Sequence, residues 1–304
     1  MENDPKLHNA FLKFDPSTAV KQDFPYPSSI MYYIKTCQKE FEFYYKFVKT
    51  CKYFYSPTDP VPCFYLGNVV HLNPGQKLII RVFTQIYHLL PDDLKKIKKI
   101  WLMGDFRVTP VSLPLRYYSC ILNNLFLSNI HGLLISKQNI SFNDFQLLIS
   151  SKTLTKLSIV AGASVMDESD NTRVKLDKIL ECVPNIHSFT FDFPDAGTAK
   201  YVKKIMTLIN PLKMNHFVLR NIIKPFDFET FSAFMKINPK ILYQLNFSND
   251  CPLPRECIQK LQAFVDEIIA NGESENPPPQ ISFPGSNEEA QKTLKVLLKK
   301  YKNR

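Results

Sequence analysis

Two groups of residues in this chain have types and spacings that could hold a metal ion. The acidic run 167–170 and Asn171 have the acid spacing of a calcium loop, but Thr172 stands where such a loop requires glycine. Cys251 and Cys257 could ligate zinc, but no further residues at a suitable spacing complete a tetrahedral set. We therefore predict a helix-start loop at the acidic run, and we expect no metal ion or other cofactor.

Catalytic motifs of the common hydrolases and nucleotide-binding enzymes are missing from the sequence. It contains no Gly-x-Ser-x-Gly elbow and no phosphate loop that ends in Gly-Lys-Ser or Gly-Lys-Thr. No His-Glu-x-x-His helix occurs among its six histidines. We therefore predict that the chain is not an enzyme.

The formal net charge of +10 raises the question of nucleic-acid binding. The densest basic group closes a stretch that opens with Glu288 and Glu289, and it consists of Lys292, Lys295, Lys299, Lys300, Lys302 and Arg304. Acids at the start of a helix and bases at its end complement the helix dipole, which is a sufficient reason for this arrangement. We expect no nucleic-acid partner, and phosphate binding by this tail is the alternative.

Composition indicates a folded chain in a reducing compartment. Hydrophobic residues make up 45% of the 304 residues, which is enough for a sizeable core. The seven cysteines are scattered, odd in number and without a Cys-x-x-Cys pair, as expected for thiols in the cytoplasm or the nucleus. Residues 1–23 lack the apolar run of a signal peptide, and no segment is apolar enough to span a membrane.

An amphipathic stretch followed by a short hydrophobic-x-hydrophobic strand recurs along the chain. The strand centres are 25, 32, 32, 28, 28 and 36 residues apart and fall at Ile100, Leu125, Leu157, Phe189, Phe217, Leu245 and Ile281. Three copies introduce the strand with similar residues, Val183-Pro184-Asn185, Ile209-Asn210-Pro211 and Ile237-Asn238-Pro239. A period of this size predicts a stacked array of supersecondary units.

Each unit is predicted to contain a strand, a loop and a helix. The helices are marked by apolar residues one turn apart, and Asp170 or Thr172 could cap the helix that begins near Leu176. Proline follows three of these helices and stops them, because it cannot continue the hydrogen-bond ladder. The apolar stripes are Phe145, Leu148, Ile149; Leu176, Ile179, Leu180, Val183; Tyr201, Ile205, Leu208; Phe228, Phe231, Met235; and Ile258, Leu261, Val265, Ile268.

Stacked units of this kind resemble an irregular leucine-rich-repeat solenoid over residues 99–304. The resemblance implies an α/β fold with parallel strands and outer helices around one continuous core. Asn129 and Asn221 fit the asparagine ladder of that family, whereas Asp192, Ser248 and Pro284 stand where a strict ladder would continue. The alternative is an ordinary α/β domain whose strands are not in sequential order.

The amino-terminal part differs from the repeats. Pro27 suits the first turn of a helix whose apolar face would consist of Ile30, Met31 and Ile34. A second helix would follow, with Phe43, Phe47 and Cys51 one turn apart. Short helices in so few residues bury too little surface to be stable alone. We therefore interpret this segment as a docking module, although such an apolar face is by itself more often part of a core.

The same segment resembles an F-box of the kind found in large nematode F-box-like families. The opening of the F-box phrase is matched by Tyr26, Pro27, Ile30, Met31 and Ile34, and its close by Cys51, Lys52 and Phe54. Ser29 replaces the customary acid, and Thr50 stands where valine is usual. The resemblance implies that Pro27, Ile30, Met31 and Ile34 face a Skp-type adaptor of a cullin-RING ubiquitin ligase.

The predicted organisation is a mobile leader at 1–23, an F-box-like module at 24–56, a connecting region at 57–98 and a leucine-rich-repeat-like domain at 99–304. The resemblance implies a substrate-recognition adaptor of an SCF-type ligase, which holds an unidentified protein substrate near the ubiquitin-charged enzyme so that transfer becomes effectively intramolecular. The alternative is a non-enzymatic interaction scaffold that never joins a ligase.

The substrate surface is predicted on the sheet face that points away from the core. Side chains alternate along a strand, so Trp101, Phe126, Ser158, Val218 and Asn246 should point outward. The same alternation would place Ser128, His216 and Arg220 on that face. Alternatively, Phe64, Tyr65 and Leu66 of the connecting region fold over Trp101 and Phe126 and make them part of the core.

Overall fold

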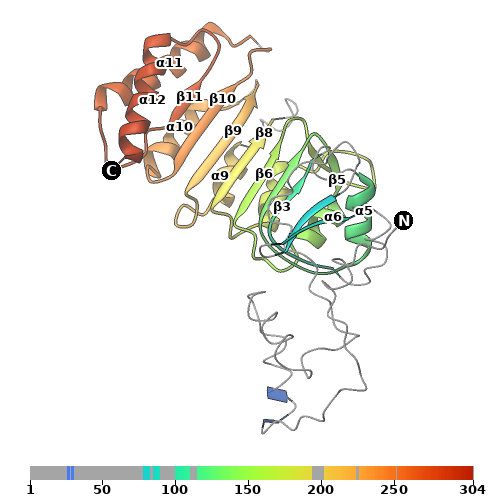
Figure 1. Cartoon of the computed structure of the whole chain (residues 1–304). Helices are drawn as coiled ribbons and strands as arrows, with labels where there is room; N and C mark the ends of the chain where they lie inside the picture. The colour runs from blue at the N-terminus through green and yellow to red at the C-terminus, as the bar shows by residue number, and fades with distance from the viewer. Residues whose placement is uncertain are drawn as a thin grey trace, which may run out of the picture.

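The computed structural model describes part of the chain, and Figure 1 shows its course. The described residues are 26–27, 29–30, 78–82, 85–89, 100–109, 115–193, 202–223, 226–250 and 252–303. The leader, most of the F-box-like segment and most of the connecting region lie outside these ranges. Some side chains within the described strands and helices lie outside the description as well, those of 78–82, 85–89, Trp101, Met103, 115–117, Phe126 and Leu127.

Strands and helices alternate along most of the described chain. The strands are β1 (Leu78–Val82), β2 (Gln85–Leu89), β3 (Ile100–Val108), β4 (Leu125–Ser136), β5 (Asn139–Ser141), β6 (Lys156–Val160), β7 (Ser164–Met166), β8 (Ser188–Asp192), β9 (His216–Ile222), β10 (Leu242–Phe247) and β11 (Gln280–Ser282). The helices are α5 (Leu115–Asn123), α6 (Phe142–Leu148), α7 (Leu176–Cys182), α9 (Val202–Leu208), α10 (Phe228–Ile237), α11 (Arg255–Asn271) and α12 (Glu288–Lys302).

Seven parallel strands form the main sheet, in the order β3-β4-β6-β8-β9-β10-β11. This order follows the chain, and each connection between neighbouring strands contains a helix. The α/β class and the parallel sheet are as predicted, whereas the alternative with strands out of chain order is wrong. Two small sheets accompany the main one, an antiparallel pair β1-β2 and a parallel pair β5-β7.

The helices form where the sequence carries apolar residues spaced one helical turn apart. Phe145 and Leu148 of α6, Leu176 of α7 and Phe231 of α10 are all buried. Ser141 and Asp227 begin α6 and α10 as capping residues, because their side chains accept hydrogen bonds from backbone N–H groups in the first turn. The predicted cap of α7 is wrong, since Lys175 occupies that position and its side chain makes no capping bond.

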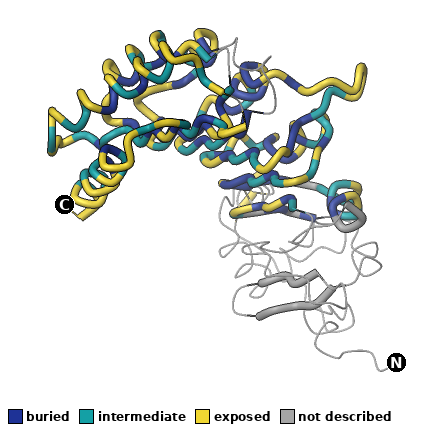
Figure 2. The backbone as a smooth tube through the Cα atoms, turned by 90° about the horizontal axis from the view of Figure 1, so that it is seen from above, coloured by how far each residue is buried: buried dark blue, intermediate teal, exposed yellow. Residues whose placement is uncertain are grey.

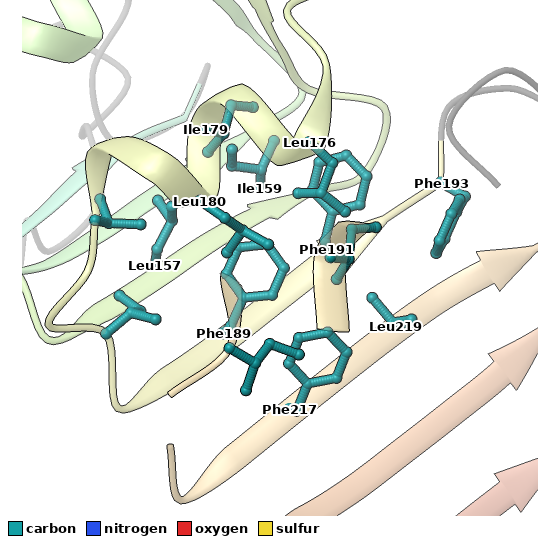
Figure 3. Close-up of a cluster of buried hydrophobic side chains, with 14 of the residues drawn as sticks. Leu157, Ile159, Leu176, Ile179, Leu180, Phe189, Phe191, Phe193, Phe217 and Leu219 are labelled. Carbon is teal, nitrogen blue, oxygen red and sulfur yellow. The ribbon is translucent and has the colours of Figure 1, made fainter. Parts of the chain in front are cut away.

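The core lies between the helices and the strand faces turned toward them. Figure 3 shows Leu157, Phe189 and Phe217, from three neighbouring strands, under the side chains of α7. Ring centroids of Phe189 and Phe217 are 5.6 Å apart, and those of Phe217 and Phe231 are 5.9 Å apart. Tyr243 joins the same cluster, 6.0 Å from Phe231. The core therefore continues from strand to strand. Burying one Phe side chain contributes about 2–3 kcal/mol to the free energy of folding.

The predicted strand centres are register partners in four of the six steps. Ile100 pairs with Leu125, Leu157 with Phe189, Phe189 with Phe217, and Leu245 with Ile281. Between β4 and β6 the partner of Leu157 is Leu133, because β4 is longer than its predicted core and uses its second half. Between β9 and β10 the partner of Leu245 is Leu219, two residues beyond the predicted centre.

One edge of the main sheet is covered by the last helix. Leu294 and Ala290 of α12 are buried, and the Gln291 amide donates a 2.7 Å hydrogen bond to the backbone oxygen of Ile281 in β11. Asn287 caps the helix by accepting hydrogen bonds from two backbone N–H groups. Acids begin α12 and bases end it, as the sequence predicted. Covering the edge protects β11 from pairing with another chain.

Ion pairs connect neighbouring helices on the outside of the molecule. Lys204 of α9 lies 2.6 Å from Asp177 of α7, and Lys236 of α10 lies 2.7 Å from Glu267 of α11. A second pair joins α10 to α11 through Glu229. The first of these contacts joins α9 to α7 and the other two join α10 to α11, although exposed pairs contribute only ~0–1 kcal/mol each.

Candidate binding face

The main sheet has one face that none of the described helices covers. In Figure 1 this face is turned toward the viewer, and α9 and α10 lie behind the strands. In Figure 2 buried residues follow the strands and the helix sides that face them, while the outer helix turns are exposed. We call the uncovered side the open face; by strand alternation its central residues are Lys156, Ser158, Ser188, Thr190, Asp192, His216, Val218, Arg220, Leu242, Gln244 and Asn246.

A row of register partners crosses the middle of the open face. It runs from Leu134 in β4 through Ser158, Thr190 and Val218 to Gln244 in β10. All but one of these side chains are half-buried, and the exception is Val218, which is only 1% exposed. From Ser158 to Gln244 the side chains in this row are therefore polar, except for the buried Val218.

A second row lies at the amino-terminal ends of the strands. Lys156, Ser188, His216 and Leu242 are register partners across four strands. Burial lowers the pKa of His216, and the positive charges of Lys302 and Arg220 lower it further. His216 is therefore neutral at pH 7, because burial and the two nearby cations all disfavour its protonated form.

A buried carboxylate lies at the carboxyl-terminal end of β8. Asp192 is 8% exposed, and its Oδ2 accepts a 2.6 Å hydrogen bond from the backbone N–H of Ala161. That N–H points to Asp192 because Ala161 and Gly162 form a turn with positive φ at the end of β6. The other oxygen, Oδ1, has no hydrogen-bond partner. Arg220 is the register partner of Asp192 on β9, and its side chain is exposed.

The structure places the predicted substrate-binding residues at different depths. Ser158 and Asn246 are half-buried on the open face, and Val218 lies between them but is covered. Trp101 and Phe126 belong to β3 and β4, but their side chains lie outside the description, so both predictions about them stay open. In the backbone, Phe126 is the extra residue where the register shifts between Ile100 and Trp101.

The outward direction predicted for Ser128 is wrong. Its side chain is fully buried and donates a hydrogen bond to the backbone oxygen of Leu148 in α6. Two register shifts interrupt the β3–β4 pair, and each inserts one residue and reverses the side-chain alternation. The first of them, at Phe126, explains the error at Ser128. Ser128 and Ile130 consequently face the helices before the shift near Gly104, and Leu133 faces them after it.

Only the start of the predicted docking face is described. Residues 29–30 are helical, and the N–H of Ile30 donates a 3.0 Å hydrogen bond to the backbone oxygen of Pro27. Ile30 is 44% exposed and Tyr26 is 58% exposed. Met31 and Ile34 lie outside the described residues.

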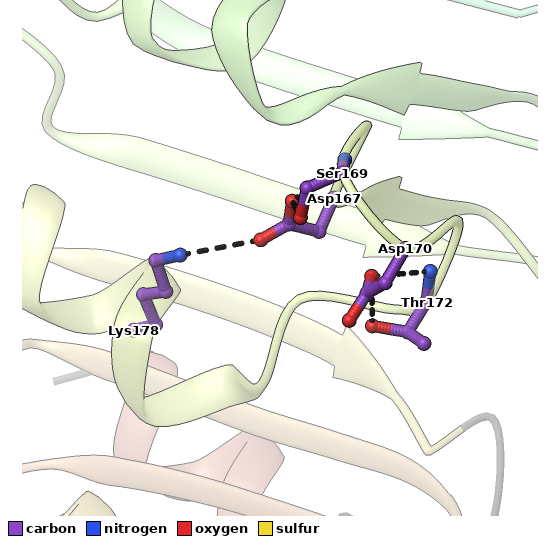
Figure 4. Close-up of polar contacts among 5 residues, drawn as sticks. All are labelled: Asp167, Ser169, Asp170, Thr172 and Lys178. Carbon is purple, nitrogen blue, oxygen red and sulfur yellow. Dashed lines mark hydrogen bonds and ion pairs between the residues drawn. The ribbon is translucent and has the colours of Figure 1, made fainter.

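The acidic run forms a hairpin-like loop rather than the start of α7. The backbone N–H of Asp167 donates a 2.8 Å hydrogen bond to the oxygen of Thr172 across the loop, and Lys178 contacts Asp167 from α7 (Figure 4). Hydrogen bonds from Ser169 lower the pKa of Asp167. Asp167 and Asp170 thus accept hydrogen bonds from Ser169 and Thr172 of their own loop. Within the described ranges, no three histidine, cysteine or acidic side chains come together as metal ligands.

Sequence reasoning missed the β8 part of the open face. Asp192 was considered only for its departure from an asparagine ladder, and Ser188 and Thr190 were not assigned to a surface. The signal was present in the alternation of Ser188-Phe189-Thr190-Phe191-Asp192, since two buried Phe place the other three side chains on the opposite side. The unpartnered oxygen of Asp192 could not be inferred in this way.

The described residues contain no helix that is both long and apolar enough to cross a lipid bilayer. No family model matches this chain, and a search of curated proteins found no significant match.

Proposed function

We propose that this protein is a non-enzymatic substrate-recognition adaptor of an SCF-type ubiquitin ligase. The amino-terminal segment would dock a Skp-type adaptor through Pro27, Ile30, Met31 and Ile34, and the repeat domain would bind a protein substrate. The proposal includes an irregular leucine-rich-repeat-like solenoid for residues 99–304.

The observation that carries the proposal is a parallel sheet whose strand order follows the chain and whose open face is left uncovered by every described helix. A sequential array of this kind is the expected product of stacking one unit on the next. It also leaves a broad face to which extended or folded protein segments can bind. The substrate surface of the proposal is this open face, with Ser158 and Asn246 on it.

The docking half of the proposal rests on the F-box resemblance and on one local observation. The turn that Pro27 begins exposes two apolar side chains, Tyr26 and Ile30, as a docking helix requires. An adaptor that covers these side chains would remove them from water.

Co-purification with a Skp-type adaptor tests the proposal. We expect the wild-type chain to retain the adaptor and the double variant Ile30→Asp/Ile34→Asp to lose it, because burying an unpaired carboxylate costs several kcal/mol. Leu212→Asp is the matched control, since Leu212 is 95% exposed in the turn after α9 and should leave adaptor binding unchanged.

The competing function is an interaction scaffold independent of ubiquitin ligation. The open face supports a scaffold as well as a ligase adaptor, because neither use depends on the docking segment. Failure of the wild-type chain to retain any Skp-type adaptor would decide for the scaffold. A double variant that binds the adaptor normally would move the docking face away from Ile30 and Ile34.

A further inference from the structure

Charge is distributed unequally between the two sides of the main sheet. The ion pairs of Lys178, Lys204, Lys236, Lys260, Lys292 and Lys300 all involve helices or the loops that flank them, and none involves a central residue of the open face. On the open face, neither Lys156 nor Arg220 forms a side-chain hydrogen bond or ion pair. In the helix layer, many charged side chains are thus paired with charges of opposite sign, whereas the open face holds cations without partners.

The positive region is centred on β9. The charged groups that act on His216 are both cations, Lys302 from α12 and Arg220 from the same strand. Its register partners on β8 and β10 are Ser188 and Leu242, which carry no charge. An anionic group that approached this part of the sheet would therefore meet a positive potential.

A hydrogen-bond acceptor without a partner lies beside this positive region. Asp192 is more than nine-tenths buried, and its Oδ1 accepts no hydrogen bond, although Oδ2 is satisfied by Ala161. A buried polar atom left in this state is costly, and such atoms in native proteins usually have a role. The register pairing of Asp192 with Arg220 places an acceptor and a cation side by side on neighbouring strands.

We propose that the open face at β8 and β9 binds an extended, Asp- and Glu-rich segment of the protein substrate, with Arg220 holding a carboxylate and Asp192 Oδ1 accepting a backbone N–H. This inference rests on the proposed function, because it names the substrate class of the same face. A peptide offers both groups at close spacing, since every residue except proline carries an N–H next to its side chain.

A nucleic acid fits this face less well than a peptide. The phosphodiester backbone offers only acceptors, so it has no N–H to donate to Asp192 Oδ1, whereas a peptide backbone carries one at every residue except proline. Proteins that bind single-stranded nucleic acids usually stack the bases on aromatic side chains, and the central residues of the open face include no Phe, Tyr or Trp. Serine, threonine and glutamine side chains instead suit the polar backbone of a peptide.

Fluorescence anisotropy with the purified full chain tests the inference without any adaptor present. The probe is a labelled peptide of alternating Glu and Ser, compared with a Gln–Ser peptide of equal length. We expect the acidic peptide to bind at least about tenfold more tightly and to weaken as salt rises, because exposed charge pairs are screened.

Variants locate the site. Arg220→Gln should weaken binding of the acidic peptide about tenfold, Arg220→Lys should restore most of it, and Lys203→Gln on the exposed side of α9 is the matched control. Asp192→Asn should weaken binding by a similar factor without lowering the melting temperature, because the amide can still accept from Ala161 but offers an N–H₂ in place of the second acceptor.

Three results would overturn the inference. The first is equal affinity of the wild-type chain for the Glu–Ser and Gln–Ser peptides, and the second is unchanged affinity of the Arg220→Gln variant for the Glu–Ser peptide. The third is tighter binding of a single-stranded oligonucleotide of equal charge, which would reassign the face to nucleic acid. Adaptor binding without acidic-peptide binding would overturn this inference alone. Acidic-peptide binding by a chain that retains no Skp-type adaptor would overturn only the ligase function.

Discussion

At the scale of single residues, the buried hydroxyl of Ser128 shows which side chains of β4 point toward the helices. Its hydrogen bond to the oxygen of Leu148 joins the strand to the end of α6, where helix carbonyls lack partners within the helix. Ser158 has the same chemistry but lies half-buried on the open face. The two serines therefore separate a structural position from a surface position.

Ser128→Ala should lower the free energy of unfolding by about 1–3 kcal/mol, because the variant leaves a buried carbonyl without its donor. Ser158→Ala is the control and should change it by less than about 0.5 kcal/mol. Urea denaturation of both variants and the wild type measures the difference. Equal effects of the two substitutions would mean that the hydroxyl of Ser128 does not secure α6 to the sheet.

At the scale of elements, α7 and α9 are joined by a carboxylate that is much less exposed than its partner. Asp177 is 6% exposed, whereas the side chain of Lys204 is 51% exposed and also contacts Glu181. Burial by itself would raise the pKa of Asp177, but the hydrogen bond and the charge of Lys204 outweigh it and hold that pKa below its usual value. The contact between α7 and α9 therefore depends on the ionisation of Asp177.

A carboxylate with a lowered pKa stabilises the fold above its unfolded value near 3.8, and the gain is lost as the pH falls through the folded value. Lys204→Met removes the cation and leaves burial to raise the pKa of Asp177. We expect the melting temperature of the variant to fall further below wild type as the pH rises from about 3 to about 6.

Lys292→Met is the control for this titration, because Lys292 pairs with the exposed Glu289 within α12. Thermal melting of the three proteins across this pH range measures the effect. A constant difference between Lys204→Met and wild type at every pH would show that the contact between α7 and α9 does not depend on the ionisation of Asp177.

At the scale of the whole molecule, each unit contacts its neighbours in the sheet and in the helix layer. Helix α9 packs against α7 and α10, and α11 packs against α12. Aromatic rings continue this arrangement through the core, since Phe217 contacts Phe189 on one side and Tyr243 on the other. In a repeat array, stability is approximately a sum over the units and the interfaces between neighbouring units.

Phe217→Ala at the centre of the array should lower the free energy of unfolding by about 3–5 kcal/mol, whereas Phe217→Leu should cost less than about 1.5 kcal/mol. Hydrogen exchange should show the largest loss of protection in β8, β9 and β10, with little change in β3 and α12. Uniform loss of protection across residues 100–303 would indicate one cooperative unit and contradict an array of neighbouring interfaces.

Local sequence pattern determined most of the described helices, most strand cores and the α/β class. Apolar stripes such as Leu176, Ile179 and Leu180 predict a buried helix face, because the helical period depends only on residues close in sequence. Pro184, Pro211 and Pro239 marked helix ends for the same local reason. The spacing of the units also indicated the sequential strand order that the sheet adopts.

Tertiary structure alone decided the register, and with it the composition of the open face. One shift turns Ser128 toward the helices, and another places both Arg220 and Asn221 opposite the single Asn246. Asn221 adopts a positive φ of 53° at that point, a conformation that asparagine tolerates better than most residues. Bulges depend on the neighbouring strand, so the period of one strand cannot predict them. Nor could a single strand reveal that Asp192 receives one hydrogen bond from the turn of β6 and lacks another, because both facts arise only when neighbouring units stack.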